Sequence, residues 1–182
     1  MAYNVRKTEL EGLLVIEPSV YSDERGFFVE KYRSSDFKAA GLPYDFVQIG
    51  HSFSKRDVLR GMHFQLRSAP MGKLVNVIEG GIFDVAIDVR KDSGTYKKWF
   101  GIELTGSNCL MLYIPEGFAH GFVVLEDRTH VIYAFTGEYS KPAERGINWN
   151  DPSIGIKWPV KNPILSEKDR VAPLLDESDN DW

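Results

Sequence analysis

Short apolar segments that alternate with polar residues run along most of this chain of 182 residues. In the clearest, residues 82–90, every second side chain is apolar: Phe83, Val85, Ile87 and Val89. A period of two is that of a β-strand, whose side chains point alternately to opposite faces of a sheet. Similar runs occur at 13–16, 27–32, 58–65, 74–78, 100–104, 110–114, 122–125 and 131–135, with turn-forming residues between many of them. The pattern predicts an all-β chain folded as an antiparallel sandwich or barrel.

Helical signals are scarce. Residues 34–36 offer an N-cap, 37–40 give one or two turns with an apolar face, and Gly41 and Pro43 supply an end. Beyond Ile147 the alternation fades, and we expect irregular packing segments with one short helix. No linker or repeat divides the chain. We therefore expect one domain over residues 1–173 and a flexible acidic tail over 174–182.

The charge distribution limits the choice of partners. The chain has 22 Lys and Arg against 26 Asp and Glu, and four of the acids lie in the last seven residues. The remaining residues are balanced, 22 against 22, so the net charge of −4 belongs to the tail. A neutral body argues against nucleic acid or an anionic membrane as a partner, because both attract a basic surface.

Cysteine content and hydropathy restrict the compartment. The first residues contain no apolar core of a signal peptide, and no apolar run approaches the ~18 residues of a membrane span. Cys109 is the only cysteine, which excludes a disulfide framework and favours a small buried side chain. We expect a cytoplasmic protein.

Two histidines stand in unusual local settings. In the predicted strand 58–65, alternation places His63 on one face with Gly61 and puts Arg60 on the other. Glycine beside a histidine in a strand suggests that another part of the molecule approaches the backbone closely there. His120 ends the turn Pro-x-Gly-x-x-His at the start of the next strand. Both residues could be functional groups or core histidines with hydrogen-bond partners.

Three other side chains could complete an acid–base set with these histidines. Lys73 opens a predicted strand, Tyr133 lies in the middle of another, and Asp169 belongs to a polar segment. Each also has an ordinary structural explanation, as a surface lysine, a core tyrosine and a surface acid. We expect His130 to be structural or exposed, and the surroundings of His51 favour no role.

The Pro-x-Gly-x-x-His turn resembles the second motif of the cupin barrels. The first cupin motif usually carries His-x-His among its metal ligands, whereas this chain has His63-Phe64-Gln65. The resemblance implies a cupin-type jelly roll that lacks a full metal-ligand set.

Six motifs in order give a closer resemblance. They are D-x-R-G-x-F-x-E (23–30), V-L-R-G-x-H-x-Q (58–65), K-L-V (73–75), F-D-V-A-x-D-x-R (83–90), Y-I-P-E-G-F-A-H-G-F (113–122) and W-x-D-P (149–152). Together they resemble the dTDP-4-dehydrorhamnose 3,5-epimerase family over roughly residues 5–173.

The resemblance implies a reaction. The family inverts C3 and C5 of dTDP-4-dehydro-6-deoxy-D-glucose, on both sides of its C4 ketone, to give dTDP-4-dehydro-L-rhamnose in dTDP-L-rhamnose biosynthesis. Removing a proton beside a ketone requires a base and a stabilised enolate oxygen, and needs neither metal nor cofactor. By matching motifs, His63 would be the base, Asp169 its orienting carboxylate, Lys73 the cation at the oxygen and Tyr133 the acid on the opposite face.

The same matching implies binding roles. Residues that would hold the sugar and diphosphate are Arg60, His120, Glu144 and Lys168. Residues near the nucleotide would be Arg25, Glu30 and Gln48, with Tyr139 stacked on the thymine. The family further implies a homodimer with exchanged N-terminal strands.

One departure affects the substrate region. The family usually has Gln-x-Asn where this chain has Gln48-Ile49-Gly50, so a side-chain amide is lost. The loss bears on nucleotide or sugar preference more than on acid–base chemistry. The main alternative is an epimerase acting at only C3 or only C5 of a related nucleotide-linked 4-ketosugar. Two others are a metal-dependent cupin oxygenase or isomerase that uses His63, His120 and another histidine, and a non-catalytic sugar-nucleotide-binding cupin.

Overall fold

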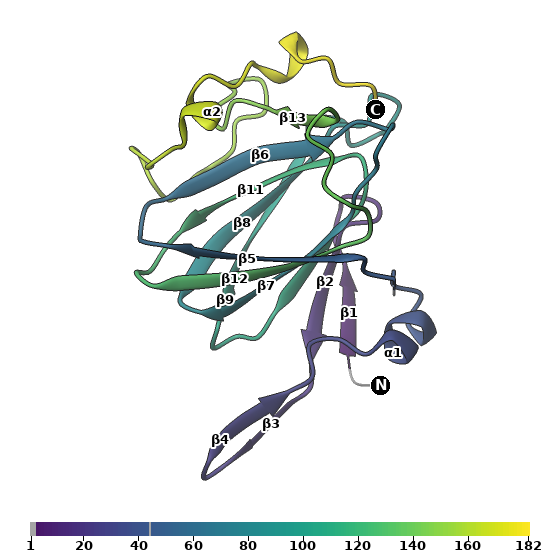
Figure 1. Cartoon of the computed structure of the whole chain (residues 1–182), viewed down its shortest axis with the longest axis vertical. Helices are drawn as coiled ribbons and strands as arrows, with labels where there is room; N and C mark the ends of the chain where they lie inside the picture. Colours follow the sequence, from purple (N-terminus) through teal and green to yellow (C-terminus); the bar gives the residue numbers. More distant parts are fainter. Residues whose placement is uncertain (1–2, 44) are drawn as a thin grey trace.

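The computed structural model describes residues 3–43 and 45–182, and two antiparallel sheets face each other in it (Figure 1). In spatial order, the six-stranded sheet contains β1 (Tyr3–Lys7), β2 (Leu14–Pro18), β10 (Met111–Ile114), β7 (Lys73–Glu79), β12 (Thr129–Phe135) and β5 (Gln48–Ser54). The five-stranded sheet contains β13 (Glu144–Gly146), β6 (Leu59–Gln65), β11 (Phe118–Val124), β8 (Gly81–Asp88) and β9 (Trp99–Thr105). This arrangement confirms the prediction of an all-β, cupin-like sandwich.

The remaining elements are short. A separate hairpin pairs β3 (Val20–Asp23) with β4 (Gly26–Val29), and α1 (Ser34–Ala39) follows it. The predicted short helix is confirmed, but it begins at Ser34 with Arg33 as its N-cap, so the N-cap expected within residues 34–36 was wrong. Gly41 beyond the helix has a positive φ of 69°. Near the C-terminus lie α2 (Glu167–Arg170) and a 3₁₀ turn, Leu175–Glu177. No helix among the described residues is long and apolar enough to cross a membrane.

Strand β8 is buried on both faces, and this explains its dense apolar pattern. On one side Ile82 and Ala86 join the core between the two sheets. On the other side Val85 and Ile87 lie in a second core, which C-terminal residues such as Trp158 cover. Because both faces are buried, polar side chains on this strand are removed from water and need partners inside the protein.

The C-terminal segment 174–182, predicted to be a flexible tail, instead packs against the body. Asp176 pairs with Lys97 at 2.6 Å, and Asp179 pairs with Arg145 at 2.5 Å. The indole of Trp182 donates to a backbone oxygen of β6 at 2.8 Å. Basic side chains of the body therefore neutralise acids that composition alone assigned to a free tail.

The β3–β4 hairpin extends away from both sheets (Figure 1). Its apolar side chains are exposed, with Tyr21, Phe27 and Phe28 each more than half accessible. Cys109 is buried and unbridged, as predicted.

Candidate active site

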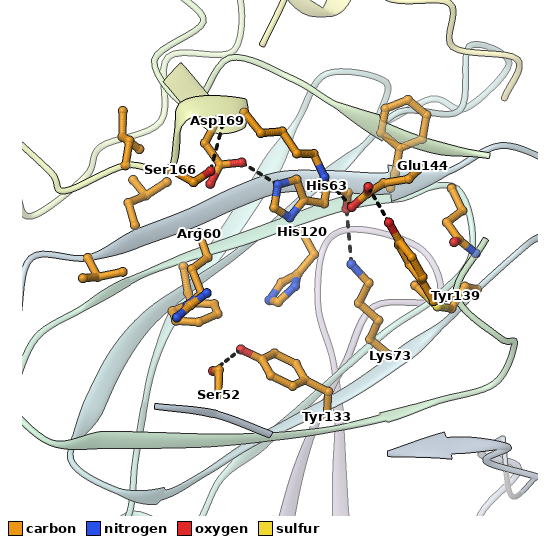
Figure 2. Close-up of a pocket in the computed structure, with 18 of the residues that line it drawn as sticks. Ser52, Arg60, His63, Lys73, His120, Tyr133, Tyr139, Glu144, Ser166 and Asp169 are labelled. Atoms are coloured by element: carbon orange, nitrogen blue, oxygen red, sulfur yellow. Dashed lines mark hydrogen bonds and ion pairs between the residues drawn. The ribbon is translucent and has the colours of Figure 1, made fainter. Parts of the chain in front are cut away.

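A cavity of about 520 Å³ lies between the two sheets, lined by residues of β5, β6, β7, β11, β12 and α2 among others. Its walls include all four side chains predicted to be catalytic: His63, Lys73, Tyr133 and Asp169. They also include most of those predicted to bind the substrate: Arg60, His120, Tyr139, Glu144 and Lys168. Residues far apart in the sequence thus converge on one site, as Figure 2 shows.

His63 on β6 is held by Asp169 on α2. The His63 Nε2 and Asp169 Oδ1 atoms are 2.6 Å apart, and the carboxylate is almost completely buried. Ser166 caps α2 by accepting a hydrogen bond from the backbone N–H of Asp169, which fixes the start of the helix. Burial alone would raise the pKa of Asp169, but the hydrogen bond and charge of His63 outweigh it and lower that pKa. The carboxylate is therefore ionised and can stabilise a protonated His63 ring.

A β-bulge in β6 corrects the predicted facing of Arg60. The pairing with β11 shifts register between His63, opposite His120, and Arg60, opposite Phe122, so β6 carries one extra residue. An extra residue reverses the alternation, and both Arg60 and His63 line the cavity. The prediction that they lie on opposite faces was wrong because strict alternation assumes a regular strand.

The glycine in this bulge allows the close approach that its position suggested. Gly61 has a φ of 131°, and a Cβ built on it would lie 2.5 Å from the Cα of Gly121 on β11. The part that approaches is the neighbouring strand itself. Any side chain at this position would push β6 and β11 apart, together with the histidines that they carry.

His120 forms a second histidine–carboxylate pair, with Asp84 of β8. Its Nε2 is 2.7 Å from Asp84 Oδ1, and both side chains are buried. Burial lowers the pKa of His120, and the negative charge of Asp84 offsets part of this effect. Sequence reasoning did not select Asp84 as a site residue, because alternation places it on the same face as Asp88 and Arg90, opposite the apolar face of the strand.

Lys73 enters the cavity from β7. It is 7% exposed, and its ammonium donates to the backbone oxygen of His63 at 3.3 Å. Burial lowers the pKa of Lys73 to about 8, against the opposing effect of the Asp84 and Glu144 charges. Lys73 thus remains mainly cationic at neutral pH while carrying a large desolvation penalty.

Tyr133 on β12 faces His63 from the other wall (Figure 2). Its hydroxyl lies 2.8 Å from the Ser52 Oγ of β5, a partner that the sequence did not suggest. Burial raises the pKa of Tyr133, which keeps the phenol protonated across the neutral range. The ring stacks on Phe135 with 5.9 Å between centroids.

A hydrogen-bonded group lies on another part of the cavity wall. Glu144 accepts from the Tyr139 hydroxyl at 2.9 Å and pairs with Lys168 at 2.5 Å. Gln48 does not line the cavity, but its Oε1 accepts from the Tyr139 backbone N–H at 2.9 Å. Tyr139 is half exposed and held at both ends, so its ring offers a fixed flat surface.

Two further predicted binding residues, Arg25 and Glu30, lie away from the cavity in this single chain. Arg25, in the hairpin turn, pairs with Asp23, and Glu30 pairs with Arg33. Neither of these predicted residues lines the cavity. Their expected place near the nucleotide stays a prediction.

Gly50 lies next to the cavity wall rather than in it. It is opposite Tyr133 in the β5–β12 pairing, and a Cβ on Gly50 would be 3.2 Å from the Phe135 ring. Phe135 itself lines the cavity. The space that a larger side chain at position 50 would need is thus taken by an aromatic ring.

The other two histidines are outside the cavity. His51 Nε2 and His130 Nδ1 are 2.9 Å apart, and the rings stack at 5.1 Å. Within residues 3–43 and 45–182, no three His, Cys, Asp or Glu side chains are grouped as metal ligands. The third ligand that the metal-dependent alternative requires is thus not found there.

Comparison with known proteins now identifies the family. The family model described as dTDP-4-dehydrorhamnose 3,5-epimerase matches residues 7–177. The chain belongs to the dTDP-4-dehydrorhamnose 3,5-epimerase family. The dTDP-4-dehydrorhamnose 3,5-epimerase of Shigella flexneri is 52% identical over 167 residues, covering 91% of this chain and 92% of the relative. The predicted family is thereby confirmed.

Solved structures agree with this assignment. The dTDP-6-deoxy-D-glucose-3,5-epimerase of Legionella pneumophila, in complex with dTDP-4-keto-L-rhamnose, is 41% identical and has a TM-score of 0.93. The match covers 97% of this chain and 95% of that one. A 3'-monoepimerase from Streptomyces bikiniensis, in complex with dTDP-quinovose, is 30% identical with a TM-score of 0.88, covering 94% and 87%. The fold is therefore shared by enzymes that differ in the number of carbons they invert.

Proposed function

We propose that this chain inverts both C3 and C5 of dTDP-4-dehydro-6-deoxy-D-glucose, giving dTDP-4-dehydro-L-rhamnose in dTDP-L-rhamnose biosynthesis. The observation that carries the proposal is the opposition of two proton-transfer groups across one cavity. His63 with Asp169 lies on one wall and Tyr133 on the other, with the buried ammonium of Lys73 between them (Figure 2). The Legionella pneumophila relative in complex with dTDP-4-keto-L-rhamnose supports the choice of substrate.

Proton removal is assigned to His63. With Nε2 donating to Asp169, Nδ1 is the nitrogen that can take the proton from the carbon beside the ketone. The electrons of the broken C–H bond move onto the ketone oxygen as an enolate. Asp169 stabilises the imidazolium, and Lys73 stabilises the enolate oxygen in a site shielded from water.

Proton return is assigned to Tyr133. The phenol donates its proton to the enolate carbon from the face opposite His63, so the new C–H bond has inverted configuration. The raised pKa of Tyr133 keeps this proton available at neutral pH, and the Ser52 hydroxyl orients the phenol. Exchange with solvent then removes the proton from His63 and restores that of Tyr133. Repeating the sequence at the second carbon completes the reaction.

Binding is assigned to the remaining residues of the cavity. Arg60, Lys168 and His120 contact the diphosphate and sugar, and Glu144 holds both Lys168 and Tyr139. The exposed ring of Tyr139 stacks on the thymine.

A homodimer would account for the residues that lie outside the cavity. The projecting β3–β4 hairpin carries exposed aromatic side chains together with Arg25. In the proposed dimer, the N-terminal strands of one copy lie against the other and bring Arg25 and Glu30 to its nucleotide. Burial of the hairpin's apolar side chains would favour such an exchange.

Inversion at a single carbon is the second candidate. The similarity to the Streptomyces bikiniensis 3'-monoepimerase favours it. So does Gly50, which stands where the family usually has Asn and lies beside the Phe135 and Tyr133 rings. Incubation with the 4-keto sugar nucleotide in deuterated water, followed by proton NMR, separates the two candidates. The proposed function predicts deuterium at both C3 and C5. Deuterium at one carbon supports the second candidate, and no deuterium refutes both.

A further inference from the structure

Asp84 is a buried acid at the centre of β8, and within the described part of the chain only one of its two carboxylate oxygens has a hydrogen-bond partner. Oδ1 accepts from His120 Nε2 at 2.7 Å. Oδ2 is buried and has no hydrogen-bond partner among the described residues. Leaving a buried carboxylate oxygen unpaired costs free energy, so a purely structural role accounts poorly for this arrangement.

A second acid on the same strand shows what a structural role looks like. Asp88 is as fully buried as Asp84 and lies on the same face of β8. Both of its carboxylate oxygens accept hydrogen bonds, from Arg90, Ser93 and Thr95. Asp88 therefore fixes the loop that follows β8 through these hydrogen bonds. Asp84, in contrast, pairs with a residue of the cavity wall and keeps one oxygen without a partner.

The charge of Asp84 acts on cavity side chains from both sheets, among them Lys73, His120 and Tyr133. It raises the pKa of Lys73 on β7 and that of His120 on β11, in each case against the larger effect of burial. The other charged groups that face Lys73 are Glu144 and Lys168. Glu144 already pairs with Lys168 at 2.5 Å, so Asp84 is the carboxylate with charge left to balance the lysine.

We propose that Asp84 is a positioning residue for the epimerisation, which holds the His120 ring by Nε2 and places a negative charge beside Lys73. The inference rests on the proposed function. It fixes the His120 proton on Nε2, so that Nδ1 of the neutral ring accepts a hydrogen bond from a sugar hydroxyl. Lys73 then remains the cation that meets the ketone oxygen.

The substitution Asp84→Asn separates the charge from the hydrogen bond, because an amide oxygen still accepts from His120 Nε2. Removing the charge should lower the pKa of Lys73 by about one pH unit. In a plot of kcat against pH, we expect the alkaline decrease (the alkaline limb) of the wild type to have its midpoint near pH 8. In Asp84→Asn this midpoint should shift to lower pH by about one unit, so that kcat at pH 9 is about tenfold below that of the wild type. An unchanged alkaline limb overturns the proposal.

Asp88→Asn is the matched control. It removes an equally buried charge from the same face of the same strand, so we expect a lower melting temperature. The alkaline limb should stay where it is in the wild type. A limb that moves equally in both variants would show a general effect of buried charge and overturn the assignment to Asp84.

Two NMR measurements need no turnover. The ¹⁵N imidazole spectrum of the wild type should show His120 with its proton on Nε2 between pH 6 and 9, and a proton on Nδ1 overturns the proposal even where Asp84→Asn does not fold. Titration of the Lys73 side chain should give a lower pKa in Asp84→Asn. If the pKa falls but wild-type enzyme exchanges no substrate protons, the proposed function has failed, although the effect of the Asp84 charge on Lys73 is confirmed. If epimerisation proceeds and the pKa is unchanged, the positioning role has failed.

Discussion

Replacing Lys73 with methionine should make the protein more stable and much less active. Methionine has a similar length and no charge, so Lys73→Met removes an ammonium that is 7% exposed. The pKa of Lys73 falls from the ordinary 10.5 to about 8, chiefly because of burial. Since a shift of one pKa unit corresponds to about 1.4 kcal/mol, burying the charged form of Lys73 lowers the free energy of unfolding at pH 7 by about 3 kcal/mol. The free energy of unfolding should therefore rise by up to that amount in the variant. The loss of attraction between Lys73 and Asp84 offsets part of this gain.

The gain should depend on pH with a defined sign. The native state releases the Lys73 proton near pH 8, whereas the unfolded chain keeps it until about 10.5. Between these values the unfolded state binds more protons, so wild-type stability rises with pH. Lys73→Met lacks this group, and its advantage over wild type should shrink from pH 8 upwards and vanish near 10.5.

Urea unfolding followed by tryptophan fluorescence at pH 7 and pH 10 measures both quantities. Lys161→Met, at an exposed lysine, is the matched control and should change stability by less than about 0.5 kcal/mol. The kcat of Lys73→Met should fall at least about 100-fold, since the enolate loses its cation. A variant less stable than wild type at pH 7, a stability difference independent of pH, or near-normal turnover would each refute the reasoning.

Three further changes test the fold around the site. Gly61→Ala should lower the free energy of unfolding by about 3 kcal/mol, because φ is 131° and the Cβ would press on β11. The control Gly94→Ala has open space around its Cβ and should leave thermal unfolding nearly unchanged. Equal melting temperatures of the two variants would contradict this. Gly50→Asn should raise KM for the sugar nucleotide several-fold, because its Cβ would lie 3.2 Å from the Phe135 ring, and an unchanged KM in steady-state kinetics would count against it. Deleting residues 174–182 should lower the free energy of unfolding in urea by at least about 3 kcal/mol, because the burial of Leu175 and the other contacts of that segment are lost. Unaltered stability would support the original prediction of a flexible tail.

The sequence predicted the strands that are rich in apolar residues, but not the polar or very short ones. Strand β5 reads Gln-Ile-Gly-His-Ser-Phe-Ser, and its Gly and Ser residues are typical of turns rather than strands. Every second residue of this strand is exposed, so it has no apolar run to predict it. Strand β13 has three residues and exists because it pairs with β6. The hairpin strand β3 is exposed along its whole length. It has no face in the core, so its sequence lacks the alternation of apolar and polar residues that predicts a strand. These elements depend on tertiary contacts, which local propensity does not record.

The site was predicted where local sequence carries its chemistry. Gly61 beside His63 and the turn before His120 are local signals, and the structure places both histidines in the cavity. The pairing of His63 with Asp169 spans 106 residues, and no spacing rule predicts it. Asp84 was missed for a different reason: its partner lies on the adjacent strand, and a buried acid is meaningful only once both faces of β8 are known to be covered.

The most direct test of proton transfer from opposite walls is deuterium incorporation at C3 and C5 in two variants, His63→Asn and Tyr133→Phe. Each would be incubated with the 4-keto sugar nucleotide in deuterated water and followed by proton NMR. We predict that His63→Asn incorporates no deuterium at either carbon. Tyr133→Phe should incorporate deuterium with retained configuration, because His63 removes the proton and returns it from the same face. Inversion at the wild-type rate in Tyr133→Phe, or exchange in His63→Asn, would contradict the account.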